Sequence, residues 1–178
     1  MKLIEPDERY LSQVAEFRKE FLDAGSSMDG QGPLRRMADP AEWLRFCRAC
    51  KTEAGCPPQF VPATQFLYVR ESDDRIVGMI QVRHRFNDYL EKYAGHIGYS
   101  IRPSERRKGY AKAMLKDCLP YCREIGLHRV MISCIRGNEA SARTILANGG
   151  VYESTVSCEA EGVELERYWI DLDRSMKK

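Results

Sequence analysis

Short runs of alternating or continuous apolar residues recur along the whole chain and predict β-strands. Residues 64–70 and 75–84 are rich in β-branched and aromatic side chains, and the polar segment 71–74 between them is typical of a turn. These two runs therefore predict an antiparallel hairpin. The full set of predicted strands is 2–4, 64–70, 75–84, 96–101, 129–135, 151–157 and 166–172.

Between several of these runs, apolar residues recur at helical spacing. The first predicted helix covers about 6–22. The second begins sharply at Asp39, because aspartate is a good N-cap and Pro40 suits the first helical position. A loop rich in glycine separates the two helices, and a proline-rich loop at 55–62 follows the second.

Two further helices lie in the second half of the chain. One runs from about Arg107, and Pro120 is expected to kink or end it. The other is capped by Asn138 and ends at the Asn-Gly-Gly of 148–150. The mixed order of elements predicts an α+β fold, with a single mixed, mostly antiparallel curved sheet of about seven strands and helices on both faces.

The composition is that of one globular domain spanning 1–178. Hydrophobic residues make up 43% of the chain and charged residues 30%. No apolar run is long enough to span a bilayer, and the N-terminus lacks the apolar core of a signal peptide. We therefore expect a cytoplasmic protein with no membrane partner. The formal net charge of +2 disfavours a dedicated nucleic-acid-binding protein.

Seven cysteines, an odd number in a chain without an export signal, indicate reduced thiols. Cys47 and Cys50 have the spacing of a metal or redox pair. However, they lack a second such pair or two histidines, and they lie in a helical pattern. Packing is therefore favoured over zinc or redox chemistry, and no metal is expected.

The most informative stretch is 95–115, where an alternating apolar run ends at Arg102 and a basic loop leads into a helix. The first turn of a helix offers free N–H groups and a partial positive charge, which attract anions. Gly109 allows a ligand to approach the backbone closely. Neither a Walker A loop nor a dinucleotide-binding fingerprint is present. The stretch predicts a phosphate site; a solvated basic helix start is the alternative.

Residues 106–111 (RRKGYA) have the form R-x-x-G-x-A. This stretch resembles the acetyl-CoA loop of the GNAT superfamily of N-acetyltransferases, which follows the pattern Q/R-x-x-G-x-G/A between the fourth strand and the third helix. A later N-x-x-S…N-G-G segment is similar to a second motif of the family, and the predicted element order agrees over nearly the whole chain. The second motif comprises 129–135, Asn138, Ser141, Ile145 and 148–150.

The resemblance implies acetyl-CoA as the acetyl donor and assigns its contacts. Backbone groups of Tyr99 and Ile101 would bond the pantetheine arm, and N–H groups of 106–111 would hold the pyrophosphate. Asn138 and Ser141 would face the pantetheine and the thioester side. It also implies that the fourth and fifth strands splay apart, with a bulge near Gly98. The cofactor-binding residues expected on this basis are Tyr99, Ser100, Ile101, Arg106, Arg107, Lys108, Gly109, Tyr110, Ala111, Asn138 and Ser141.

The implied reaction is direct acetyl transfer from the thioester to an amine, which must lose a proton before it attacks. The family's usual acid, a tyrosine on the fourth helix, is replaced here by Ile145, and Ser133 stands where some members have a basic carboxylate. Tyr152 is expected to pack in the core, with the role of the acid as the alternative.

His96 is the candidate general base, because it begins the fourth strand and an imidazole titrates near neutral pH. The alternative is a half-buried histidine bonded to a backbone carbonyl. His84 is a weaker candidate, and His128 is expected to lie in a surface turn.

The acceptor is expected to be a small-molecule or peptide amine of unidentified structure. Its pocket would come from the first two helices, the proline-rich loop and the last strand pair, although core packing is the alternative for each aromatic residue. A non-catalytic module that binds acyl-CoA, or a protein that binds another phosphorylated metabolite, remains open, as does a homodimer formed through the last strands. The aromatic candidates for the pocket are Trp43, Phe60, Phe66, Tyr89 and Tyr93.

Overall fold

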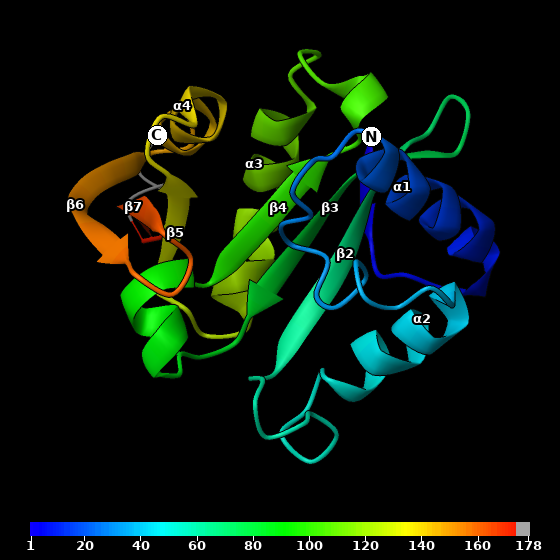
Figure 1. Cartoon of the computed structure of the whole chain (residues 1–178), viewed down its shortest axis with the longest axis horizontal. Coiled ribbons are helices and arrows are strands. Elements are labelled where there is room, and N and C mark those ends of the chain that lie inside the picture. Colours follow the sequence, from blue (N-terminus) through cyan, green and yellow to red (C-terminus); the bar gives the residue numbers. More distant parts are fainter. Residues whose placement is uncertain (174–178) are drawn as a thin grey trace.

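The computed structural model describes residues 1–173, and its seven strands and four longer helices confirm the predicted α+β class (Figure 1). The strands are β1 (Lys2–Ile4), β2 (Ala63–Arg70), β3 (Arg75–Arg83), β4 (Ile97–Ile101), β5 (Arg129–Ile135), β6 (Gly150–Cys158) and β7 (Val163–Asp171). The helices are α1 (Leu11–Asp23), α2 (Pro40–Ala49), α3 (Tyr110–Glu124) and α4 (Glu139–Leu146), with short helical turns at Glu8–Tyr10, Leu90–Ala94 and Pro103–Glu105.

Local capping signals place the starts of two helices where the sequence predicts them. The Asp39 carboxylate accepts a 2.8 Å hydrogen bond from the Ala41 N–H and caps α2. The Asn138 side chain accepts a 3.2 Å bond from the Ser141 N–H and caps α4. Each bond satisfies one of the N–H groups that a helix start leaves without an intrahelical partner.

α3 passes through Pro120 and continues to Glu124, so of the two expected outcomes, a kink or an end, the helix does not end at this proline. An internal proline removes one backbone hydrogen bond and costs about 3 kcal/mol. Cys118 and Cys122, on either side of it, are both fully buried. Packing of this apolar face outweighs the local preference of the proline.

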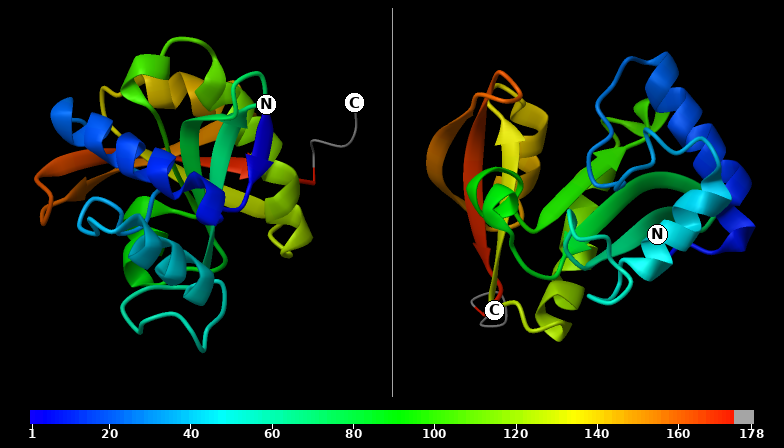
Figure 2. Two further views of the ribbon diagram at one scale, coloured as in Figure 1. Left: turned by 90° about the vertical axis from the view of Figure 1, so that its right-hand side faces the viewer. Right: turned by 60° about the horizontal axis from the view of Figure 1, so that its bottom comes forward.

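The seven strands form two sheets rather than the single sheet expected from the sequence. One sheet has the order β1-β2-β3-β4 and the other β5-β7-β6, all antiparallel. Gly95 and Ile132 form an isolated bridge between them, and beyond it the sheets diverge (Figure 2). β3 and β4 pair one to one, so the bulge expected near Gly98 does not occur in this ladder.

Helices cover both faces of the β1–β4 sheet (Figure 1). A first core cluster packs the sheet against α1 and α2 and includes Phe17, Phe21, Trp43, Leu67 and Met79. A second cluster lies under α3, reaches β5, β7 and α4, and includes Ile80, Met114, Ile132, Ile145 and Ile170. Because this second core crosses from one sheet to the other, the diverging sheets are held in a fixed arrangement. In residues 1–173, no helix has the length and apolar character needed to cross a membrane.

Candidate active site

The edge of β4 that faces away from β3 has no strand partner among residues 1–173, although its Ile101 carbonyl accepts a hydrogen bond from Arg106 Nε. On the paired edge, the Arg83 N–H donates to the His96 carbonyl at 2.8 Å and the Arg102 N–H donates to the Val77 carbonyl at 2.9 Å. Successive residues of an antiparallel strand direct their backbone groups to alternate sides. The groups of the odd-numbered residues of 97–101 therefore point into the gap between the sheets, where an extended ligand can add as a further strand.

The loop that follows β4 presents a row of free N–H groups at the start of α3. Arg107 and Gly109 adopt left-handed backbone conformations, with φ of 62° and 82°. Within residues 1–173, the N–H groups of 107–111 have no protein acceptor. A Cβ added at Gly109 would meet no atom within 4 Å. An arrangement of this kind, with open space in front of it, suits the oxygens of a pyrophosphate.

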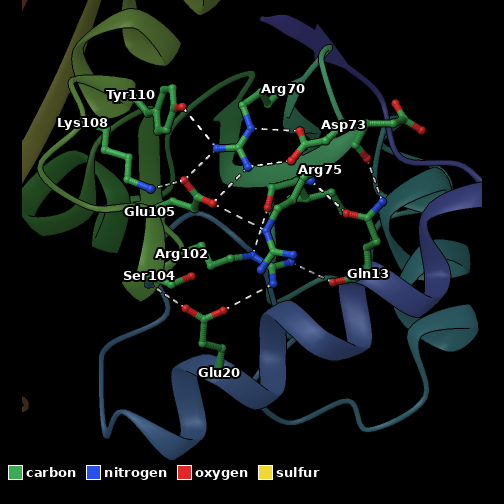
Figure 3. A network of polar contacts seen from close by, with 12 residues as sticks. Gln13, Glu20, Arg70, Asp73, Arg75, Arg102, Ser104, Glu105, Lys108 and Tyr110 are labelled. Carbon is green, nitrogen blue, oxygen red and sulfur yellow. Dashed lines mark hydrogen bonds and ion pairs between the residues drawn. The ribbon is translucent and has the colours of Figure 1, made fainter.

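Arg102 belongs to the core and not to the anion site, although it is the first charge of the basic segment. Its side chain is 2% exposed. Its Nε donates to the Ile76 carbonyl at 3.0 Å, and its Nη1 lies 3.3 Å from a carboxylate oxygen of Glu20 (Figure 3). Arg102 therefore fixes α1 to the sheet beneath the loop.

The other three cationic side chains of the basic segment, Arg106, Arg107 and Lys108, differ in the number of contacts that they make within the protein. Arg106 donates through Nε to the Ile101 carbonyl at 3.2 Å and through Nη2 to Ser26 Oγ at 2.7 Å. Lys108 is drawn to a buried carboxylate on the loop. Arg107 is exposed, and within residues 1–173 its guanidinium has no ion-pair or hydrogen-bond partner. Arg107 is therefore the side chain most available to a phosphate.

The buried carboxylate is Glu105, which anchors the loop from below. It is 6% exposed, and it receives Arg70 Nη1 at 2.9 Å and Lys108 Nζ at 2.8 Å (Figure 3). Burial opposes ionisation of Glu105, but the hydrogen bonds from these two cations outweigh it and hold its pKa below the ordinary value. The charged network holds the backbone of the loop in one conformation before a ligand arrives.

Tyr99 and Ser141, two predicted site residues, meet across the gap between the sheets. Tyr99 Oη lies 2.9 Å from Ser141 Oγ, and the Ser141 N–H is in turn held by Asn138. Burial raises the pKa of Tyr99 to about 12, so its hydroxyl is protonated at neutral pH. The sequence predicted only a backbone role for Tyr99; its side chain ties β4 to α4.

The surroundings of His96 do not favour the predicted role of general base. The ring is 6% exposed, and its centroid lies 3.9 Å from that of Phe86. Nδ1 accepts a 3.0 Å hydrogen bond from the Met131 N–H, which leaves the proton on Nε2. Burial, together with the charges of Arg83 and Arg129, lowers the pKa of His96 to about 4. The neutral imidazole therefore offers a donor rather than a basic lone pair.

The structure also places the other candidate proton-transfer residues, which are His84, His128 and Tyr152. His84 Nε2 is 2.9 Å from Thr64 Oγ1, and burial lowers the pKa of the imidazole. His128 is exposed, as expected, with Nδ1 3.2 Å from Asp173. Tyr152 is 51% exposed, so the expectation that it packs in the core is wrong.

A cavity of about 360 Å³ opens on the α1–α2 face of the sheet, next to β4. Its walls combine β3, the loop 24–39 and the proline-rich loop. Its apolar lining residues include Met28, Phe46, Phe60, Val61 and Leu90, and its polar ones are Asp29, Gln59, Gln81, Arg83, Asn87 and Tyr89. The volume lies within the range of small-molecule sites.

Of the predicted pocket aromatics, the structure brings Phe60 and Tyr89 to this cavity. Trp43 and Phe66 are buried in the two cores. The ring of Tyr93 contacts that of Tyr89 in a tilted arrangement, with centroids 5.5 Å apart. Arg83 and the loop 24–39 were not among the residues predicted for the pocket, because nothing in the local sequence marks a strand-end arginine as facing a cavity.

Cys47 and Cys50 are both buried at the end of α2, which agrees with a packing role. Residues 1–173 contain no group of three histidine, cysteine or acidic side chains able to hold a metal. Cys50 Sγ lies 3.3 Å from Cys56 Sγ, a pairing that the CxxC spacing did not indicate.

The chain matches the model of one protein family, and its fold is similar to those of many solved structures. Residues 34–149 match the model of the acetyltransferase (GNAT) family. A search of curated proteins found no match.

Three solved structures illustrate the shared fold. The ribosomal-protein-S5-alanine acetyltransferase of Vibrio fischeri is 18% identical over 96% of this chain and 92% of its own, with a TM-score of 0.72. A variant of the spermidine N-acetyltransferase SpeG of Vibrio cholerae is 12% identical over 99% and 98%, with a TM-score of 0.69. MccE, a microcin C7 self-immunity acetyltransferase in complex with acetyl-CoA and AMP, is 18% identical over 95% and 91%, with a TM-score of 0.69.

Proposed function

The chain belongs to the acetyltransferase (GNAT) family, and from this premise we propose that it transfers an acetyl group from acetyl-CoA to an amine held in the cavity beside β4. One observation carries the proposal. The open edge of β4 leads directly into a loop whose N–H groups, within residues 1–173, have no protein acceptor. A strand-like arm that ends in a pyrophosphate matches this arrangement.

The residues present fit acetyl-CoA. The outer backbone groups of Tyr99 and Ile101 would bond the pantetheine arm, and the side chain of Ser141 would line the gap next to it. The N–H groups of 107–111 would hold the pyrophosphate, with Arg107 supplying a full charge. MccE, which shares the fold, is described in complex with acetyl-CoA, which supports this placement.

Bound acetyl-CoA supplies an acetyl group activated as a thioester. Backbone N–H groups on the outer edge of β4 would face the carbonyl oxygen and stabilise the negative charge that develops there. The protonated hydroxyl of Tyr99 lies in the same gap, in contact with Ser141. Nδ1 of His96 already accepts a hydrogen bond from the Met131 N–H, so it is not available to take up a proton. We therefore propose that the amine loses its proton to water and that His96 acts only as a hydrogen-bond donor, through Nε2.

Two measurements test the function. Isothermal titration should show acetyl-CoA binding, and a thiol-release assay with amine acceptors should show turnover; no binding at high micromolar acetyl-CoA would contradict the proposal. Gly109→Val should abolish binding, because the side chain would fill the space in front of the loop. Gly126→Val is the matched control, since Gly126 also has positive φ (88°) and open space but lies at the other end of α3.

A further inference from the structure

Arg83 lies at the end of β3 and lines the cavity together with Gln81. Its Nη1 donates to the Gly95 carbonyl at 3.1 Å and to the Ala94 carbonyl at 3.4 Å. These two bonds fix the direction of the guanidinium. Its Nη2 has no hydrogen-bond partner within residues 1–173.

No carboxylate in residues 1–173 lies within ion-pair distance of Arg83, which is partly buried. By contrast, Arg102 and Arg70 each have a carboxylate partner in the network of Figure 3. Arg102 contacts Glu20 at 3.3 Å, and Arg70 contacts Glu105 at 2.9 Å. Burial lowers the pKa of Arg83 below its ordinary value, but an arginine side chain stays charged in proteins. A partly buried guanidinium that has no ion-pair partner among residues 1–173 attracts an anionic ligand.

The free side of this guanidinium faces the proposed reaction centre. A Cβ added at Gly98, in the middle of β4, would lie 3.5 Å from Arg83 Nη2. A carboxylate bound by Arg83 therefore sits next to β4. An amine a few bonds from that carboxylate reaches the edge of the strand along which the thioester is placed.

The rest of the cavity favours an uncharged, apolar remainder of the acceptor. Apolar side chains, including those of Met28, Phe46, Phe60 and Leu90, form more of its surface than the polar ones, which are mostly uncharged. The one carboxylate among the lining residues, Asp29, is exposed and accepts a 2.9 Å hydrogen bond from Ser27. A polyamine would place several positive charges beside Arg83 with this single acid to balance them, so the acceptor differs from the one named for the SpeG relative.

We propose that the acceptor is a small amino acid-like compound whose carboxylate is bound by Arg83 while its neighbouring amine is acetylated; this rests on the proposed function. In the reaction the amine nitrogen forms a bond to the acetyl carbon as the carbon–sulfur bond breaks. The CoA thiolate leaves and is protonated, and the amine proton passes to water. The carboxylate is unchanged, and Arg83 binds without exchanging a proton.

The test is thiol release from acetyl-CoA with matched acceptors: apolar amino acids, their amides and their decarboxylated amines. Amino acids should show a kcat/KM about 100-fold higher than the matched amides, because loss of one partner of a desolvated charge pair has an effect of this order. Equal or faster turnover of the amides or decarboxylated amines would overturn the inference.

Variants separate binding by Arg83 from a structural role. Arg83→Gln should lower kcat/KM for amino acids about 100-fold while leaving turnover of the decarboxylated amines unchanged or higher. Arg83→Lys keeps the charge and should retain part of the preference for amino acids over their amides. It serves as the second variant if Arg83→Gln fails to fold. Arg85→Gln is the control, since Arg85 is exposed and paired with Glu53 at 2.6 Å.

The outcomes also distinguish this inference from the proposed function. Absence of acetyl-CoA binding by isothermal titration overturns the function itself. Normal acetyl-CoA binding with release of thiol by amides but not by amino acids overturns the role of Arg83 alone. A loss in Arg83→Gln that is equal for all acceptor classes would show a merely structural residue.

Discussion

Gly30 packs backbone to backbone against Gly98: a Cβ added at Gly30 would stand 2.0 Å from the Gly98 carbonyl oxygen. Gln65 Nε2 donates to the Gly30 carbonyl at 2.9 Å, and Ser100 Oγ donates to the Asp29 carbonyl at 2.7 Å. Together these contacts pin the loop 24–39 onto β4. The loop forms one wall of the acceptor cavity, so its position sets the shape of the site.

Gly30→Ala should therefore raise the KM for the acceptor and lower stability by about 2–3 kcal/mol, because a Cβ cannot fit and the loop must move. Acetyl-CoA affinity should change little. Gly25→Ala is the matched control: Gly25 also has positive φ (58°), but a Cβ there meets nothing within 4 Å. It should show only the cost of the left-handed backbone, about 1 kcal/mol. Equal effects of the two variants on KM would contradict a role for the Gly30–Gly98 contact.

Arg107→Gln should weaken acetyl-CoA binding about 3- to 10-fold and reduce its dependence on salt, since one exposed charge near a phosphate contributes modestly and is screened. Isothermal titration at two salt concentrations measures both effects. Arg36→Gln is the control, because Arg36 is also exposed and, within residues 1–173, has no ion pair. Unchanged affinity in Arg107→Gln would remove this residue from the site.

Glu105→Gln should destabilise the fold by about 2 kcal/mol, because Arg70, Arg75 and Lys108 lose a buried ion-pair partner. For a chain of this size the melting temperature should fall by about 4–8 °C. Glu164→Gln, which breaks the exposed pair with Arg136, should shift it by little. The pKa of Glu105 is depressed, so its contribution is present above the unfolded pKa and is lost as pH falls through the folded one. The melting temperatures of Glu105→Gln and Glu164→Gln should therefore differ less in strong acid than at neutral pH.

His96→Gln should retain most activity, because a glutamine amide can accept from the Met131 N–H and still donate a hydrogen bond on its other side. His96→Ala should lose activity and stability. If His96 were the general base, both variants would lose activity alike and the acidic limb of the pH–rate profile would change. The comparison of kcat/KM across pH for the two variants decides between these roles.

His96 also gives the fold a dependence on pH. Its pKa is about 4 when folded against an ordinary value of 6.5. The unfolded chain thus takes up this proton first as pH falls, and stability contributed by the neutral ring is complete above pH 6.5 and lost toward pH 4. Between these two pH values the contribution of His96 to the free energy of unfolding changes by about 3 kcal/mol. Denaturant unfolding at both pH values should show a smaller acid loss in His96→Gln than in the parent protein.

Much of the fold follows from short-range chemistry. The alternation of 96–101, the proline after it and Gly109 fix a strand, a loop and a helix start, because backbone preferences act within a few residues. The same holds for the caps at Asp39 and Asn138. For this reason the order of elements along the chain and the resemblance to the family could be predicted before any contact was known, whereas the division of the strands into two sheets could not.

What each charged group does was decided by the tertiary structure. Arg102 and Arg107 lie five positions apart in one basic segment, yet the first is buried against Glu20, 82 residues away in the sequence, and the second faces solvent. Likewise, Arg83 faces a cavity and has no ion-pair partner among residues 1–173, and His96 is kept neutral. The sequence by itself determined where the backbone turns and which segments pair locally. The solvation and partners of a charge depend on residues brought together from distant parts of the chain, so only the folded arrangement assigned these side chains their roles.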